Sequence, residues 1–241
     1  AGGEYNIAIG NGSLDSLTSG DNNTALGYQA GTGITTGGNN VIIGEEAGGA
    51  DMTSAADGTI LMGAYAGNAI TTGARNIAIG YQAMDALTVG DDNIAIGHDA
   101  LGSMATTDLN DKNIAIGQYA LANAGASSNV ASANVALGYS AGVQVTTGDH
   151  NVIVGMNAGV AINEGTRNIC IGTGAGETIT AGDECMAIGY DSDCAADIQK
   201  AIALGAFAIC TADNSVCIGT NITNSTTRTV KIGDSGASMV S

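Results

Sequence analysis

The fold is decided by a short unit that is clearest in residues 76–97, which read NIAIGYQAMDALTVGDDNIAIG. The pentapeptide Asn–Ile–Ala–Ile–Gly occurs twice here, and its closing glycines, Gly80 and Gly97, are 17 residues apart. Self-similarity at a fixed period is the signature of a repeat protein, in which each unit builds one layer and neighbouring layers bury each other's apolar faces.

Copies of this unit cover nearly the whole chain, from Asn6 to Gly233, and there are 14 of them. Most lie 17 residues apart, three spacings lengthen to 19, 20 and 21, and the last three shorten to 16, 14 and 14. We therefore expect one repeat domain over residues 1–241, with regular coils at about 6–190 and shorter coils at about 190–236. The expected ladder consists of Asn6, Asn23, Asn40, Asn76, Asn93, Asn113, Asn134, Asn151 and Asn168, with Gly10, Gly27, Gly44, Gly63, Gly80, Gly97, Gly117, Gly138, Gly155 and Gly172.

The residues between two copies repeat as well. An alanine usually stands three residues after the unit glycine, an aliphatic residue often seven after it, and a second glycine often ten after it. This pattern predicts two strands and two glycine corners per coil, with positive φ at both corners. Glycine this frequent costs a helix about 1 kcal/mol per residue, so a helical repeat is excluded.

Side chains alternate between the two faces of a strand, which raises the question of which face is inside. We expect the large residues, such as Ile77 and Ile79, to fill the coil and the small middle residue, such as Ala78, to point outward. The outer alanines would then form a flat apolar ladder that symmetric self-association, such as a homotrimer, covers. The residues expected on this trimer face are Ala8, Ala25, Ala78, Ala95, Ala115 and Ala136.

Composition excludes several classes of function. The chain has 38 Gly, no Pro, no Trp and one Phe, which suits thin layers better than a deep globular core. Its net charge of −17 excludes nucleic-acid binding as a main activity, and no apolar run is long enough for a membrane span. The chain starts at Ala1, so we expect a processed product or a fragment.

No catalytic or cofactor site is expected. His98 and His150 lie about three coils apart without a partner motif, and no serine has a nucleophile-elbow context. Acidic residues follow the second corner glycine at equivalent positions, for example Asp21, Asp149 and Asp183. Calcium binding by these turns is one interpretation, but the glycine-rich calcium nonapeptide is absent, so solvated turn acids are favoured.

Two further sets of residues carry open alternatives. Cys194 and Cys210 each stand five residues after a unit glycine in consecutive coils, so they should stack about 5 Å apart, within reach of a disulfide or as free buried thiols. Tyrosines that directly follow a unit glycine form either an exposed row for sugar rings or corner packing: Tyr28, Tyr81, Tyr139 and Tyr190. Inserts at 51–57, 106–111 and 126–133 are expected to bulge from one corner, as recognition loops or as neutral decoration.

The Asn-x-Ala-Ile-Gly-x-x-Ala unit resembles the head repeats of trimeric autotransporter adhesins, the YadA-like family. It is still more similar to repeats in the tail and attachment fibres of bacteriophages and other viruses, where Gly-Tyr-Gln-Ala is common, as at 27–30 and 80–83 here. The resemblance implies a left-handed parallel β-roll packed as three rolls about an axis. The 14-residue spacing at Gly205, Gly219 and Gly233 is nearest the adhesin form.

These observations predict an all-β solenoid of about 14 coils without enzymatic activity, located outside the cell on a virion or cell surface. The first expected function is a fibre segment of a virion that supports attachment to a host receptor or glycan. The alternatives are the head of a bacterial surface adhesin and a self-assembling extracellular filament subunit.

Overall fold

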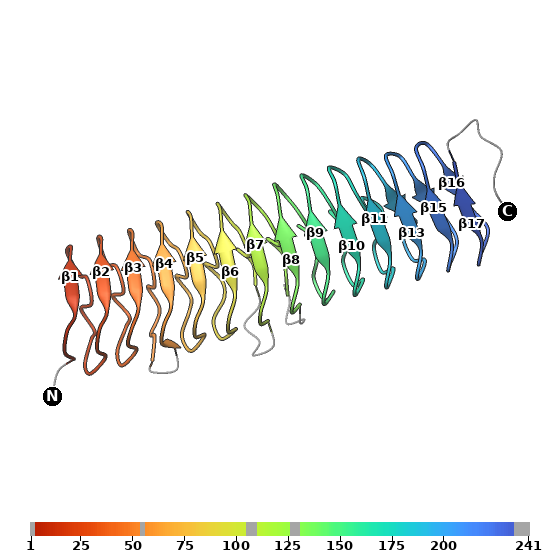
Figure 1. Cartoon of the computed structure of the whole chain (residues 1–241). Helices are drawn as coiled ribbons and strands as arrows, with labels where there is room; N and C mark the ends of the chain where they lie inside the picture. Colours follow the sequence, from red (N-terminus) through yellow and green to blue (C-terminus); the bar gives the residue numbers. More distant parts are fainter. Residues whose placement is uncertain (1–2, 54–55, 105–109, 126–130, 234–241) are drawn as a thin grey trace.

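The computed structural model describes residues 3–53, 56–104, 110–125 and 131–233. The chain is an all-β parallel solenoid, as the repeat predicts. Its coils stack into a rod with the first strand at one end and the last strand at the other (Figure 1). Residues 54–55, 105–109 and 126–130, which include much of the three predicted inserts, lie outside the described residues.

One strand from each unit joins a 14-stranded parallel sheet that runs the length of the rod, and strands adjacent in this sheet come from consecutive coils. Its strands are β1 (Ile7–Ile9), β2 (Thr24–Leu26), β3 (Val41–Ile43), β4 (Ile60–Met62), β5 (Ile77–Ile79), β6 (Ile94–Ile96), β7 (Ile114–Ile116), β8 (Val135–Leu137), β9 (Val152–Val154), β10 (Ile169–Ile171), β11 (Met186–Ile188), β13 (Ile202–Leu204), β15 (Val216–Ile218) and β17 (Val230–Ile232).

The register between neighbouring strands follows the repeat. Ile77 pairs with Ile94 and Ala78 pairs with Ala95, and the same positional match holds across the insert between β6 and β7. Each unit therefore forms one rung, and equivalent residues lie directly above one another, because the chain returns to the same point after every coil.

The predicted orientation of the strand residues is wrong. The middle residues Ala25, Ala78, Ala95, Ala115 and Ala136 are fully buried, whereas the residues on either side of them are half-buried or exposed. Ala8 is exposed because β1 is the first strand of the sheet described, but it lies in register with buried Ala25. The alanines cannot form the outer trimer face.

The physical reason is the thinness of the coil. The residue four positions after the unit glycine packs into the interior against the middle strand residue, so the two share one space. Where the middle residue is alanine in β5, β6 and β7, the partner is large: Met84, Leu101 or Leu121, all buried. Where the middle residue is Leu61 or Ile153, the partner is Gly67 or Gly159, and a Cβ on Gly67 would lie within 3 Å of the Leu61 side chain.

The second half of most coils is a turn region instead of the predicted second strand. Residues at the second and fourth positions after the unit glycine have left-handed backbones, as at Gln82 (φ 54°) and Met84 (φ 53°), which is incompatible with an extended strand. Only the shorter C-terminal coils form a second, three-stranded parallel sheet, of β12 (Asp193–Cys194), β14 (Ile209–Cys210) and β16 (Thr223–Asn224).

The two corner glycines are required for different reasons. At Gly80 the backbone has φ 138°, a region open to glycine alone, and a Cβ would meet the Gly97 carbonyl oxygen at 2.6 Å. At the second corner, Gly73 lacks a positive φ, contrary to prediction, but a Cβ there would lie 2.5 Å from the Gly90 carbonyl oxygen. Glycine is therefore needed at the second corner because the backbones of successive coils lie too close together there for a Cβ atom.

Candidate functional site: the strand face and the aromatic corner

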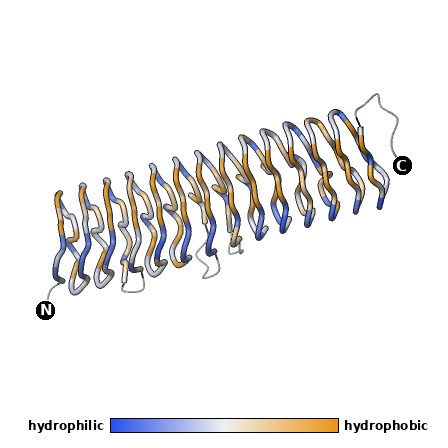
Figure 2. The backbone as a smooth tube through the Cα atoms, in the orientation of Figure 1, coloured by the Kyte–Doolittle hydropathy of each residue, from blue (hydrophilic) through white to orange (hydrophobic). Residues whose placement is uncertain are grey.

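The most extensive candidate site is the outer surface of the 14-stranded sheet, here called the strand face. It consists of the first and third residue of every strand in that sheet, and Thr24 alone among these 28 positions is polar. Figure 2 shows hydrophobic residues following the strands from coil to coil. Its most exposed members include Ile7, Ile9, Leu26, Met62, Ile116, Val152, Ile171, Ile218, Val230 and Ile232.

The strand face is held straight by the asparagine ladder, whose members are buried from Asn23 to Asn168 and do not point outward. Asn76 Oδ1 accepts the backbone N–H of Asn93 in the next coil at 2.9 Å. Its Nδ2 donates to the carbonyl of Gly90 at 2.7 Å. These asparagines thus bond backbone groups of the turn and of the next coil, and each bond helps to fix the corner at which the strand begins.

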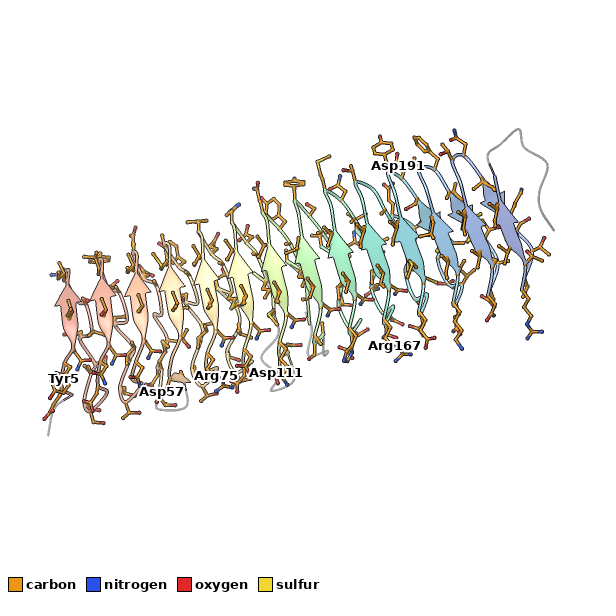
Figure 3. The ribbon with its side chains drawn as sticks, viewed as in Figure 1. Tyr5, Asp57, Arg75, Asp111, Arg167 and Asp191 are labelled. Carbon is orange, nitrogen blue, oxygen red and sulfur yellow. The ribbon has the colours of Figure 1, made fainter. Side chains whose placement is uncertain are left out.

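Acidic residues form a second ladder at the corner that precedes the strand, where Asp57, Arg75, Asp111 and Arg167 lie along one edge of the rod (Figure 3). Each carboxylate accepts a backbone N–H from the preceding coil, as Asp111 does from Asp91 at 2.8 Å and Asp183 from Thr166 at 2.8 Å. These turn carboxylates thus have a structural role, because they bond the backbone of the neighbouring coil as well as facing solvent.

Two arginines neutralise part of this acidic edge. Arg75 contacts Asp91 and Asp92, and Arg167 contacts Glu184. The hydrogen bond from Arg75 is the main cause that lowers the pKa of Asp92. Among the residues that the structure describes, no group of three or more His, Cys, Asp or Glu side chains is placed to hold a metal ion.

The opposite edge of the strand carries a row of aromatic rings, here called the aromatic corner: Tyr65, Tyr81, His98, Tyr119 and Tyr139. Successive ring centroids lie 5.3–6.1 Å apart over five consecutive coils. Of the four tyrosines expected at a corner, Tyr81 and Tyr139 belong to this row, and about half of the surface of each is exposed. Tyr190 stacks separately on Phe207, with centroids 5.2 Å apart.

Sequence reasoning missed three members of this row. Tyr65 and Tyr119 stand two residues after the unit glycine, and their left-handed backbones (φ 60° and 59°) place them beside the residues that directly follow the glycine. His98 occupies the predicted tyrosine position. The signal that could have found them is an aromatic side chain at either of the two positions after the glycine.

His98 is bonded at both ring nitrogens. Its Nε2 lies 3.1 Å from Asp99 Oδ2, and its Nδ1 lies 3.1 Å from Gln118 Nε2. A neutral imidazole with its proton on Nε2 satisfies both contacts, because it donates to the carboxylate and accepts from the amide. The histidine therefore helps to hold Asp99 in place. His150, at the other corner, is exposed.

A cavity of about 370 Å³ lies beside the aromatic corner and is lined by residues of four consecutive coils, among them Asp85, Asp99, Ser103, Tyr119, Asn123 and Val143. Burial, and then repulsion from Asp99, raise the pKa of Asp85. A second depression of about 270 Å³ shares Asn123 and adds Gln144, Thr146 and Asn163 from the following two coils.

The cysteines are buried free thiols. Cys194 and Cys210 lie in register in adjacent strands, as predicted, but without a disulfide between them. The Cys194 thiol donates to the carbonyls of Met186 and Ala201. Its side-chain interaction with Cys185 is the first cause that raises the pKa of Cys194 and lowers that of Cys185. Burial raises the pKa of Cys170, and it raises the pKa of Cys217 to about 12.

The comparisons with known proteins add no family. No protein-family model matches the chain, and no curated protein matches it significantly. Within the part of the chain that the structure describes, no helix has the length and apolar character of a membrane span. The functional argument therefore rests on the surfaces of the solenoid itself.

Proposed function

We propose that this chain is a structural fibre segment that assembles as a homotrimer through its strand face. The observation that carries the proposal is the row of exposed or half-buried Ile, Val, Leu and Met side chains at the outer positions of the 14 strands, interrupted among those positions by Thr24 alone. A chain with a net charge of −17 has ample acidic residues for its surface, yet none of them stands on this face. Contiguous exposed apolar surface of this extent marks an interaction site.

The dimensions of the strand face suit a three-fold assembly. With strands about 4.8 Å apart and about 10 Å of strand length, 14 strands present roughly 600 Å² per chain. Three such faces packed about one axis would bury roughly 1,800 Å² in total, counted as flat area, which is in the range of specific protein interfaces. A second copy of this chain fits better than another partner, because the strand faces of two copies have the same spacing between strands along the whole rod.

The rod shape supports a mechanical role. The sheet ties each coil to the next, and the asparagine and acidic ladders add bonds between many of the coils, so stiffness does not depend on any single contact. The resemblance of the repeat to viral tail-fibre repeats favours an extracellular virion fibre that supports host attachment. The head of a bacterial trimeric adhesin is the second candidate, because it would use the same trimeric rod.

The test is the oligomeric state of the purified chain. A trimer should have three times the monomer mass of 23.5 kDa, about 70 kDa, by light scattering or sedimentation equilibrium. Ile116→Glu combined with Val152→Glu should dissociate it, because both side chains are already exposed in the single coil and charge would be buried only in the assembly.

The matched control is Ala181→Glu, which adds the same charge at an exposed position of the turn region. It should leave the mass unchanged. A wild-type chain that sediments as a folded monomer at micromolar concentration would refute the trimer, and so would a strand-face variant that stays trimeric.

A further inference from the structure

The two depressions beside the aromatic corner share Asn123 and are here called the groove. The trimer proposal assigns no role to this groove. The strand face lies on the outer residues of the strands, whereas the groove is formed by the residues that follow the unit glycine by two to eight positions. Packing of three strand faces therefore does not use the groove residues.

We propose that this groove binds a neutral oligosaccharide, a ligand class that gives the proposed fibre its attachment target and rests on that proposed function. The two depressions share Asn123, and together they extend over consecutive coils along the rod. An elongated groove of this kind fits a linear chain of sugar rings better than a single compact ligand.

The aromatic component comes from Tyr119, whose ring lines the larger cavity. It is held between His98 and Tyr139, with centroid distances of 5.3 and 6.1 Å, so little rotamer freedom remains to be lost on binding. Such a ring offers an apolar surface to the C–H groups of a sugar and a hydroxyl to its polar edge.

The polar component is a mixture of acceptors and donors at spacings set by the coil. Asp99 presents a carboxylate whose Oδ2 lies 3.1 Å from Nε2 of His98. Asp85 lies on the neighbouring coil. Ser103, Asn123, Gln144, Thr146 and Asn163 add hydroxyl and amide groups further along. Hydroxyls and amides both donate and accept, which matches sugar hydroxyls.

Charge decides which sugars fit. The two carboxylates and the net charge of −17 disfavour sialylated or sulfated chains, and among the described residues that line the two depressions none is a lysine or arginine. A cationic peptide would also be attracted to Asp85 and Asp99, but the amide and hydroxyl groups along the rest of the groove would give it no charge partner. A neutral glycan uses both parts.

The experiment is a binding titration of the full chain with neutral hexasaccharides (maltohexaose, cellohexaose, N-acetylchitohexaose and mannohexaose), with polysialic acid and hexalysine as charged probes. We expect saturable binding of at least one neutral probe and about tenfold weaker affinity in Tyr119→Ala. The control Tyr28→Ala removes an exposed tyrosine outside the groove and should bind like wild type.

Asn123→Ala, which removes the group shared by both depressions, provides a second variant should Tyr119→Ala fold poorly. The proposal is overturned if no neutral probe binds at millimolar concentration, if only polysialic acid or hexalysine binds, or if both variants bind as wild type. Mass measurements on the same samples separate this result from failure of the trimer, since a trimer that binds no glycan refutes the groove alone.

Discussion

Asn134 Oδ1 accepts two hydrogen bonds from Asn151 in the next coil, one from its backbone N–H and one from its side-chain Nδ2, each at 3.0 Å. Nδ2 of Asn134 donates to the Gly148 carbonyl at 2.8 Å. The donor and acceptor groups of one buried amide thus join two coils and close one corner. This is why asparagine recurs at this position and why an aspartate or serine would satisfy fewer groups.

Replacement of Asn151 by alanine should destabilise the rod locally. The substitution leaves the backbone N–H of Asn168 and the carbonyl of Gly165 without their partners in a buried setting, at about 1–3 kcal/mol each. Hydrogen exchange should therefore accelerate in β9 and β10 before it does in distant coils. Asn123→Ala, at an exposed asparagine, is the control, and equal protection in both variants would contradict the ladder's role.

Because a middle strand residue and the residue four positions after the unit glycine share one space, a substitution at one should compensate for the loss of stability caused by a substitution at the other. Leu61→Ala alone should lower the free energy of unfolding by about 2–5 kcal/mol through a cavity. Gly67→Leu alone should clash with Leu61, because a Cβ at position 67 would overlap the Leu61 Cδ2 atom. The double variant reproduces the Ala-plus-Leu pair of β6 and should be markedly more stable than the sum of the single effects.

Chemical denaturation of the three variants gives the coupling energy. A purely additive double variant would show that the two residues do not share one space. The matched control pairs Leu61→Ala with a turn substitution far from it, Ala181→Glu, for which additivity is expected.

The buried thiols predict a loss of stability in alkali. Cys170 and Cys217 keep their protons in the folded chain because burial raises their pKa, that of Cys217 to about 12, whereas an unfolded cysteine ionises near pH 8.5. The folded state then binds more protons than the unfolded state, so the stabilising contribution is complete below about pH 8.5 and declines as pH rises toward 12.

The expected slope is up to about 1.4 kcal/mol per pH unit for each thiol in that window. Unfolding free energies measured from pH 7 to pH 11 check it against the double variant Cys170→Ala/Cys217→Ala, which retains the tyrosines and lysines that also titrate there. In the variant, the free energy of unfolding should fall less steeply as the pH rises. Parallel profiles would show that the thiols do not cause the decline.

Much of the architecture was predictable because the period of the sequence is the period of the structure. Equivalent residues such as Ile77 and Ile94 had to stack once each unit formed one coil, and the in-register position of Cys194 and Cys210 followed from counting residues after a glycine. The aromatic corner was predicted only in part. The left-handed backbone of Tyr119 places its side chain in the same row as residues that stand one position earlier in their repeats, and the spacing of the repeat gives no sign of this.

By itself, the sequence determined the number of coils, their stacking order and the corners at which asparagine and glycine are needed. Only the tertiary structure decided which strand face is inside, because alternation gives Ile77 and Ala78 opposite faces but does not say which one meets Met84 across the coil. The interior is too thin for two large side chains at one level, so packing buried the alanine and left the isoleucines outside. The apolar surface available for assembly is therefore the Ile and Val face.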